Sequence, residues 1–247
     1  MVKRNMADAE IYIFAGILIL MLTFSGATYY FNKKRSDRIA KMGRDMGFSY
    51  EENAATDPGL MGIINKISGN PGPANTIENF LPDSELLKWG HSRSVGNLIS
   101  GNIKGREWKA FDYNYTTGSG RSSHQHCQTI FVSRLRVSAP AFVLGPEGFF
   151  DKLGDIVLKQ DIDFEIYPNF SKKYCLKGQD KNAVKGLFSP ELINLIERFQ
   201  KKIALQSDGK MIAFFIPGEK SKPEDWFQRI EEASKIFDFV IGQKKNI

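Results

Sequence analysis

A run of twenty-one residues without a charge, Ile11 to Phe31, constrains what this chain can fold into more than any other feature of it. A helix of that length rises roughly 30 Å, the thickness of the hydrocarbon core of a bilayer. The run ends on Tyr29, Tyr30 and Phe31, where interfacial aromatic residues are expected. We therefore predict an N-terminal tail and one transmembrane helix within residues 1–32, anchoring a folded module to the lipid bilayer.

The same run has an alternative reading as a cleaved secretory signal peptide. Ser25, Gly26 and Ala27 are small residues of the kind that signal peptidase accepts. Two features favour an uncleaved anchor instead. Asp8 and Glu10 stand where a signal peptide carries positive charge, and the run is longer than the usual apolar region of ~7 to 15 residues.

The distribution of basic residues around the run predicts its orientation. Only Lys3 and Arg4 precede it, whereas six Lys and Arg residues follow it closely. Basic flanking residues resist translocation and stay in the cytoplasm. The chain is therefore expected to be a single-pass protein of the cell inner (cytoplasmic) membrane, with its N-terminus outside and its C-terminal domain in the cytoplasm.

The positive charge of the chain is concentrated beside the predicted span. The net charge is +6; residues 33–45 supply +4, which leaves only +2 for residues 46–247. A basic cluster next to a membrane attracts anionic lipid headgroups, at ~1 kcal/mol per residue near the surface. Nucleic acid is consequently not predicted as a partner, and headgroup contacts are predicted for Lys33, Lys34, Arg35 and Arg38.

Residues 33–48 have the pattern of a separate basic juxtamembrane helix. Apolar side chains recur there at helical spacing, at Ile39, Met42 and Met46, and Gly47 is a plausible stop. The two cysteines, Cys127 and Cys175, form no disulfide framework and suit a reducing compartment.

The remainder, residues 49–247, is predicted to be one α+β domain with an antiparallel β-meander and flanking amphipathic helices. The meander rests on alternating apolar runs separated by turn residues. In its second strand, Phe111, Tyr113 and Tyr115 share one face and are expected to pack inward. The predicted strands are Asn97–Ile103, Trp108–Tyr115 and His124–Val132, with a fourth at Ala141–Leu144.

The regions on either side of the meander are less regular. Asp57-Pro58-Gly59 predicts a turn and Leu60–Ile67 a helix. Further predictions are strands at Ile162–Ile166 and, after a break at Pro168-Asn169, at Lys173–Leu176. A capped helix is predicted at Ser189-Pro190-Glu191, a hairpin around Ser207-Asp208-Gly209, and a last helix from Ser221, with Trp226, Ile230, Ala233, Phe237 and Val240 on one face.

The order of these features resembles a family of uncharacterised bacterial single-span membrane-anchored proteins that carry a domain of unknown function. The resemblance rests on the single span, the basic helix, the FDYNYTTGSG hairpin followed by QTIFV, and the DFEIYPNFSKKYCLKGQD segment before a capped helix. It covers most of the chain. It implies the architecture, and no catalytic residue or substrate that could be carried over.

Candidate ligand-binding residues gather around the second and third predicted strands. His124 and His126 lie two apart and project from one face of a strand, the spacing of a metal-ligand pair, but two imidazoles do not close a zinc site. Arg121 lies in a Gly- and Ser-rich turn whose backbone amides could surround an anion. Tyr113 and Tyr115 complete the candidate set. The row Asp161, Asp163 and Glu165 is better explained as a solvated strand face.

The leading hypothesis is a membrane-tethered, non-enzymatic domain that binds a protein, peptide or lipid headgroup, because no known catalytic or cofactor motif is present in the sequence. No catalytic residue, metal or cofactor is assigned. The rival hypothesis is a membrane-bound enzyme, hydrolase-like or metal-dependent, with a site around residues 108–132. It requires that Asp112, Arg121, His124 and His126 converge in one pocket.

Overall fold

The computed structural model describes residues 2–57, 77–80, 88–150, 160–162, 164 and 166–242. The turn predicted at Asp57-Pro58-Gly59 falls largely outside these residues, and the helix predicted at Leu60–Ile67 does so entirely. The helices are α1 (Val2–Asp45), α3 (Ile77–Phe80), α4 (Pro168–Lys173), α5 (Lys181–Leu187), α6 (Pro190–Glu197) and α7 (Trp226–Gly242), with short 3-10 turns η2 (Gly120–Ser122) and η4 (Pro223–Asp225). The strands are β1 (Ser49–Thr56), β2 (His91–Ile103), β3 (Arg106–Thr117), β4 (His124–Arg134), β5 (Phe142–Pro146), β6 (Gln160–Asp161), β7 (Tyr174–Gly178), β8 (Ala204–Ser207) and β9 (Met211–Phe215).

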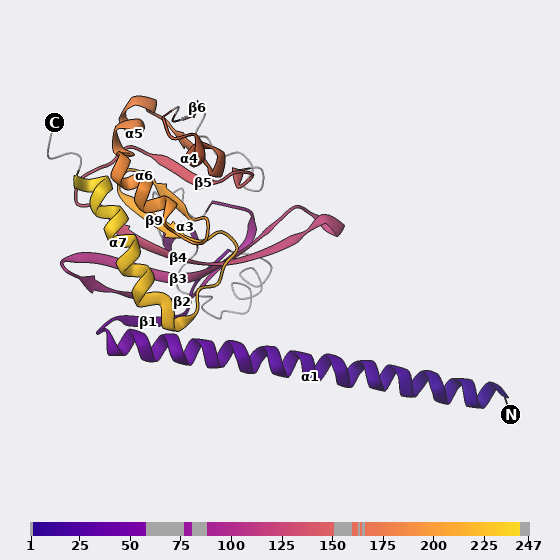
Figure 1. Ribbon diagram of the computed structural model, residues 1–247. Helices are drawn as coiled ribbons and strands as arrows, with labels where there is room; N and C mark the ends of the chain where they lie inside the picture. The colour runs from indigo at the N-terminus through magenta and orange to yellow at the C-terminus, as the bar shows by residue number, and fades with distance from the viewer. Residues whose placement is uncertain are drawn as a thin grey trace.

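The predicted α+β class is confirmed. The described strands form one nine-stranded sheet in the order β1-β2-β3-β4-β9-β8-β5-β7-β6, and every neighbouring pair is antiparallel. Figure 1 shows helices α6 and α7 packed beside this sheet, while α1 runs past the sheet and extends far beyond it. The domain therefore consists of a sheet with α4 to α7 and the end of α1 on one face and the short helix α3 on the other, and the N-terminal part of α1 projects from it.

The predicted meander is present as β2, β3 and β4, and each strand is somewhat longer than predicted. Its first turn contains Lys104 and Gly105, both with positive φ, 53° and 73°. A two-residue hairpin of this hand matches the twist of its strands and favours glycine. The second turn begins later than expected, because β3 continues to Thr117 and pairs there with His124.

The predicted fourth strand exists as β5 but does not continue the meander. β4 pairs with β9, Ile130 lying opposite Phe215, whereas β5 lies between β7 and β8. The hairpin β8–β9, predicted around Asp208, thus inserts between two strands that precede it in the chain. Local periodicity does not indicate which distant segments pair with each other. The sequence pattern therefore could not predict the order of the strands in the sheet.

Two local predictions before α5 were wrong. The strand expected at Ile162–Ile166 is not found at the three of its residues that the structure describes, since β6 ends at Asp161 and Ile166 lies in a turn with 85% of its surface exposed. Pro168-Asn169 starts the short helix α4 instead of breaking the chain, because proline fits the first turn of a helix. Ile162 and Phe164 are nevertheless buried, and the Ile162 N–H donates to the Leu176 carbonyl of β7 at 2.8 Å, so the alternation reflected packing beyond the end of β6.

Both faces of the sheet are covered. Phe111, Tyr113 and Tyr115 are 0%, 0% and 5% exposed, which confirms that they pack inward. They belong to a cluster that includes Trp89 and Phe215. On the opposite face, the second cluster joins residues of β3 and β4 to α6, α7 and the end of α1. The predicted stripe on the last helix is also confirmed, since Trp226, Ile230, Ala233, Phe237 and Val240 are all buried.

Candidate functional site

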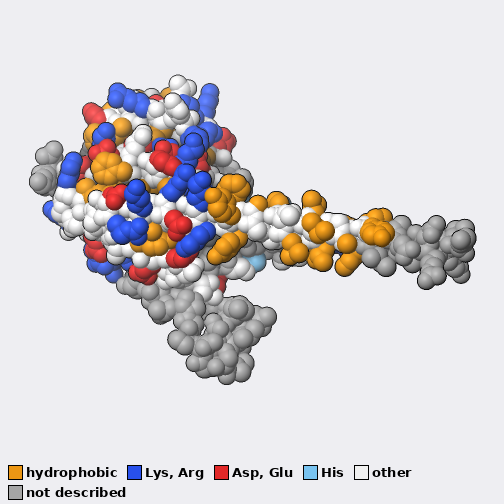
Figure 2. Space-filling view, turned by 90° about the horizontal axis from the view of Figure 1, so that it is seen from below, with side chains coloured by type: hydrophobic (Ala, Val, Ile, Leu, Met, Phe, Trp, Pro, Cys, Tyr) orange, Lys and Arg blue, Asp and Glu red, His pale blue; other side chains and the backbone are white. Residues whose placement is uncertain are grey.

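The apolar part of α1 stands apart from the domain. Every side chain from Tyr12 to Phe31 is exposed, for example Leu20 at 70% and Phe24 at 75%. In the part of the chain that the structure describes, α1 is the one helix long and apolar enough to cross a membrane, with a mean hydropathy of 1.7 over its most apolar window. Figure 2 shows hydrophobic side chains along this projecting helix, while Lys and Arg gather on the domain up to the point where the helix leaves it.

Without a break, the same helix continues into the domain. The sequence predicted a separate juxtamembrane helix, whereas α1 is continuous to Asp45. Its last turns pack on the sheet: Ile39 is 0% exposed, and Met42 and Met46 contact the same core. Gly47, with a φ of 71°, ends the helix by adopting the left-handed conformation that glycine tolerates.

A buried ion pair fixes the helix to the sheet. The Arg35 guanidinium donates from Nε to Oδ2 of Asp112 at 3.0 Å and from Nη2 to Oδ1 at 2.9 Å. The Asp112 side chain is 2% exposed and that of Arg35 is 15% exposed. The Arg35 guanidinium also lies 6.0 Å from the ring centre of Trp226, so it is enclosed by the sheet and η4–α7. Paired, two-point contacts of this kind are both strong and directional.

Two further donors bind Asp112, and the Lys220 ammonium lies 3.9 Å from its Oδ2. Asn97 Nδ2 donates to Oδ2 at 3.0 Å, and the Thr129 hydroxyl donates to Oδ1 at 2.8 Å. Thr129 Oγ in turn accepts the backbone N–H of Ser221 at 2.9 Å. Each carboxylate oxygen therefore receives two hydrogen bonds. We call Arg35, Asp112, Asn97 and Thr129 the helix latch.

The backbone is arranged to place Asn97 in the latch. The pairing of β2 and β3 shifts by one residue between Gly96 and Ile99, a β-bulge, and Asn97 within it has a φ of 52°. Asparagine tolerates this left-handed conformation better than most residues. The Asn97 amide oxygen accepts the Tyr50 hydroxyl at 3.0 Å, so β1, β2 and β3 are joined around Asp112.

For Arg35, the predicted headgroup contact needs correction. Its guanidinium is bound to Asp112 inside the domain, because α1 turns that residue toward the sheet. The other three basic residues, Lys33, Lys34 and Arg38, are exposed. Lys33 pairs with Asp37 and Glu52 at 3.4 and 3.6 Å, and Arg38 pairs with Glu224 at 2.7 Å. Headgroup contact by these three stays a prediction.

The predicted ligand-binding residues are spread along the β3–β4 hairpin. Tyr113 and Tyr115 are core residues, and the Tyr113 hydroxyl donates to the backbone oxygen of Trp89 at 3.1 Å. Burial raises the pKa of both tyrosines, so each stays neutral. The His126 ring stacks on Tyr115, with ring centres 4.8 Å apart, and Nε2 lies 2.8 Å from the Thr117 hydroxyl.

Arg121 and His124, in contrast, are exposed at the tip of the hairpin. His91 joins the tip to β2, since its Nε2 lies 2.9 Å from the Gly118 carbonyl oxygen. The geometry thus divides the predicted set into a buried aromatic base and an exposed polar tip. Ligand binding at either part stays a prediction.

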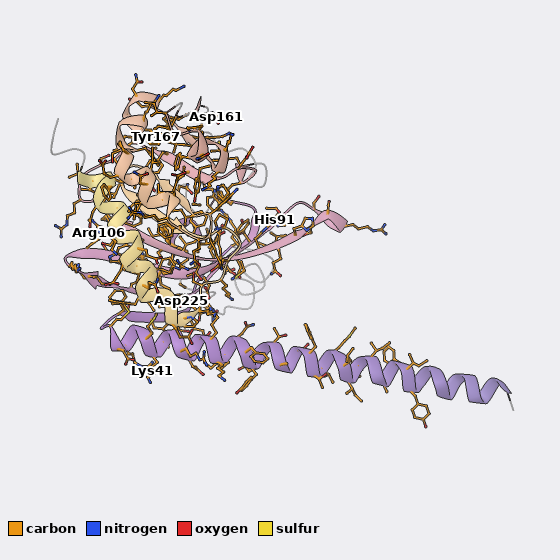
Figure 3. All side chains as sticks on the ribbon, viewed as in Figure 1. Lys41, His91, Arg106, Asp161, Tyr167 and Asp225 are labelled. Atoms are coloured by element: carbon orange, nitrogen blue, oxygen red, sulfur yellow. The ribbon has the colours of Figure 1, made fainter. Side chains whose placement is uncertain are left out.

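The convergence that an enzyme would need is not found among the four residues named for it. Asp112 is engaged in the helix latch, His126 is stacked on Tyr115, and Arg121 and His124 point into solvent. Among the described residues no three His, Cys, Asp or Glu side chains are placed to hold a metal. Figure 3 shows Asp161, from the predicted carboxylate row, far from His91 on another part of the domain. Asp163 and Glu165 lie outside the described residues.

Cys127 lies near the latch and is half-buried. Burial, the largest influence on it, raises the pKa of its thiol above the ordinary value. A raised pKa favours the thiol over the reactive thiolate. Its surroundings therefore do not favour a nucleophilic role.

Fold and latch together define an α+β domain carried on, and fastened to, an apolar N-terminal helix. No protein-family model matches the chain, and no curated protein matches it. Among solved structures, it is similar to the crystal structure of the mycobacterial trehalose monomycolate transport factor A, TtfA. That similarity covers 83% of this chain and 96% of the other, with a TM-score of 0.48 and 10% sequence identity. A likeness this distant does not establish a shared family or activity.

Proposed function

We propose that this chain is a single-span membrane protein whose cytoplasmic α+β domain is held in a fixed orientation at an anionic membrane surface and acts there as a non-enzymatic binding module. One observation carries the proposal: an apolar helix, exposed from Tyr12 to Phe31, runs without interruption into a segment fastened to the domain by a buried ion pair.

The exposed apolar surface of α1 is stabilised when it is removed from water. Thirteen large hydrophobic side chains between Tyr12 and Phe31 are exposed. At about 1.5 to 3 kcal/mol for each buried side chain, removing them from water is worth on the order of 20 kcal/mol or more. That exceeds the ~5 to 15 kcal/mol by which a typical domain is stable. A bilayer supplies such a cover over the required length.

The helix latch holds the domain in a fixed position relative to the anchoring helix. A flexible linker would let the domain tumble at the membrane, whereas α1 remains helical from the predicted span to Asp45. Arg35 follows the predicted span by only four residues and is held by Asp112. The domain should therefore present one constant face to the bilayer.

That face includes the tip of the β3–β4 hairpin. Figure 1 shows this hairpin projecting from the domain on the side toward which the N-terminal part of α1 extends. Its exposed residues, Arg121 and His124 among them, are polar and suit the headgroup region. Lys33 and Lys34 are exposed on α1 just after its apolar run. Their positive charges complement anionic headgroups.

The first test measures how close each end of the domain comes to the bilayer. A spin label at Ser123→Cys, in full-length protein whose Cys127 and Cys175 are replaced by Ser, should be strongly relaxed by a nickel-chelating lipid. A label at Asn102→Cys should not, because the twelve residues of β3 separate the two ends of the meander by ~40 Å.

Both labelled positions are exposed, so they form a matched pair. Adding Asp112→Asn should reduce the difference, since it weakens the support of the helix. Equal relaxation at Ser123 and Asn102 in the parent protein would contradict a fixed orientation.

Membrane topology is tested separately by reporter fusions after Ile247. A fluorescent protein that folds only in the cytoplasm should be active there, and alkaline phosphatase should be inactive, because basic residues follow the span. Exchanging Lys33, Lys34 and Arg38 for Glu should raise phosphatase activity. Phosphatase activity in the unmodified fusion would contradict the orientation, and a mature N-terminus at Thr28 would establish the signal-peptide alternative.

A further inference from the structure

A groove lies between α6, the loop that follows it, and α7. It consists of two adjoining hollows of about 390 and 360 Å³. Leu195, Phe199 and Ile216 line the larger hollow with apolar surface, and Phe239 extends that surface into the smaller one. Leu195 lines both hollows, and the lining residues on α7 run from Gln228 to Phe239, so the groove extends along that helix.

The rim of this groove is cationic. Arg198, Lys201, Arg229 and Lys235 line the larger hollow, against one carboxylate, Glu232. Two of these cations are already engaged: Arg229 pairs with Glu232 at 2.8 Å, and Lys201 pairs with Glu219 at 2.5 Å. The positive charge that is not paired with a carboxylate therefore resides on Arg198 and Lys235.

Arg198 and Lys235 occupy the centre of the groove. Both side chains line the larger and the smaller hollow, and both residues are exposed. Within the described part of the chain, neither forms an ion pair. Glu191, on the smaller hollow, is stabilised as a carboxylate by its own backbone N–H and Ser189, which lower its pKa. Two cations without carboxylate partners thus flank an apolar floor.

We propose that this groove binds an acidic peptide segment of a partner protein, with apolar side chains on the floor and carboxylates on Arg198 and Lys235. Arginine binds a carboxylate through two parallel hydrogen bonds. A groove lined by both apolar and cationic side chains matches a peptide that carries both apolar and acidic residues. A compact inorganic anion would leave the apolar floor uncovered.

The position of the groove and the net charge of the domain favour an acidic peptide over lipid headgroups or a nucleic acid. Figure 1 shows α6 and the C-terminal half of α7 at the side of the domain away from the N-terminal part of α1, so an anchored domain turns the groove away from the bilayer. Residues 46–247 have a net charge of only +2. That favours a locally matched peptide over a nucleic acid, whose binding depends on neutralising several phosphates.

The experiment uses full-length protein in detergent and an array of twelve-residue peptides in which Asp or Glu alternates with Leu or Phe. A parallel array replaces each acidic residue by its amide. Acidic peptides should bind and their amide counterparts should not. Arg198→Glu combined with Lys235→Glu should weaken the retained peptides at least tenfold.

Lys172→Glu combined with Lys181→Glu is the matched control, because both lysines are exposed, lie outside the groove and change the net charge equally. The control should bind the peptides as the parent does. Equal weakening by both pairs, equal binding of acidic and amide peptides, or no peptide binding would overturn the proposal. So would displacement of bound peptide by a single-stranded oligonucleotide or by anionic vesicles at lower concentration than by free peptide.

Discussion

Asp112→Ala is expected to lower the free energy of unfolding of the full-length protein by about 3 to 5 kcal/mol, the range for breaking one side of a buried ion pair. The substitution leaves Arg35 enclosed by Trp226 and the sheet without its carboxylate. It also removes the acceptor for Asn97 and Thr129. Denaturant unfolding in detergent, followed by tryptophan fluorescence, measures the loss.

Replacing both charged residues by apolar ones separates the ion pair from the general effect of cutting a core side chain. Arg35→Met combined with Asp112→Leu should be less destabilising than Asp112→Ala alone, because no charge then remains buried. Lys41→Met on the same helix is the control, since Lys41 is exposed on the part of α1 that runs along the domain (Figure 3). Losses below 1 kcal/mol for Asp112→Ala would show that the latch does not secure α1.

Phe111→Ala should cost about 3 to 5 kcal/mol, as usual for a core aromatic residue. Phe111 is 0% exposed and packs edge to face on Phe80, with ring centres 5.2 Å apart. Its removal opens a cavity in the cluster that also holds Tyr113 and Tyr115. Chemical denaturation of the full-length protein in detergent measures the change.

Phe227→Ala is the matched control for that measurement. Phe227 is the same residue type with 47% of its surface exposed, and its loss should change the free energy of unfolding by roughly 0.5 kcal/mol or less. A negligible effect of Phe111→Ala would mean that the aromatic face of β3 serves as a binding surface and not as core.

Local patterns in the sequence predicted those elements that are determined by interactions between residues close in the chain. The cap at Ser189 is an example, because its hydroxyl accepts the backbone N–H of Leu192 at 3.4 Å. The turn predicted between the strands Asn97–Ile103 and Trp108–Tyr115, which contains Lys104 and Gly105, and the stripe on α7 are others. Each depends on residues within a few positions of one another, so the spacing alone carries the information.

The helix latch depends on residues that are far apart in the chain. Arg35 and Asp112 are 77 positions apart, and Thr129 and Ser221 are 92 apart. A basic residue after an apolar run predicts a headgroup contact, and nothing near Arg35 indicates a buried carboxylate. The one available signal was Asp112 itself, a lone acid in the middle of an aromatic strand, and that pattern also fits a solvated face.

Because α1 is uninterrupted, rotation of its apolar part about the helix axis is coupled to rotation of the domain. An α-helix turns about 100° and rises 1.5 Å with each residue. One residue inserted between Phe31 and Arg35 would therefore rotate every face of the span by that angle relative to the groove between α6 and α7. In the membrane-anchored protein that we propose, the number of residues between the apolar segment and the helix latch sets the direction in which the domain faces around the membrane normal, relative to any helix packed beside that segment.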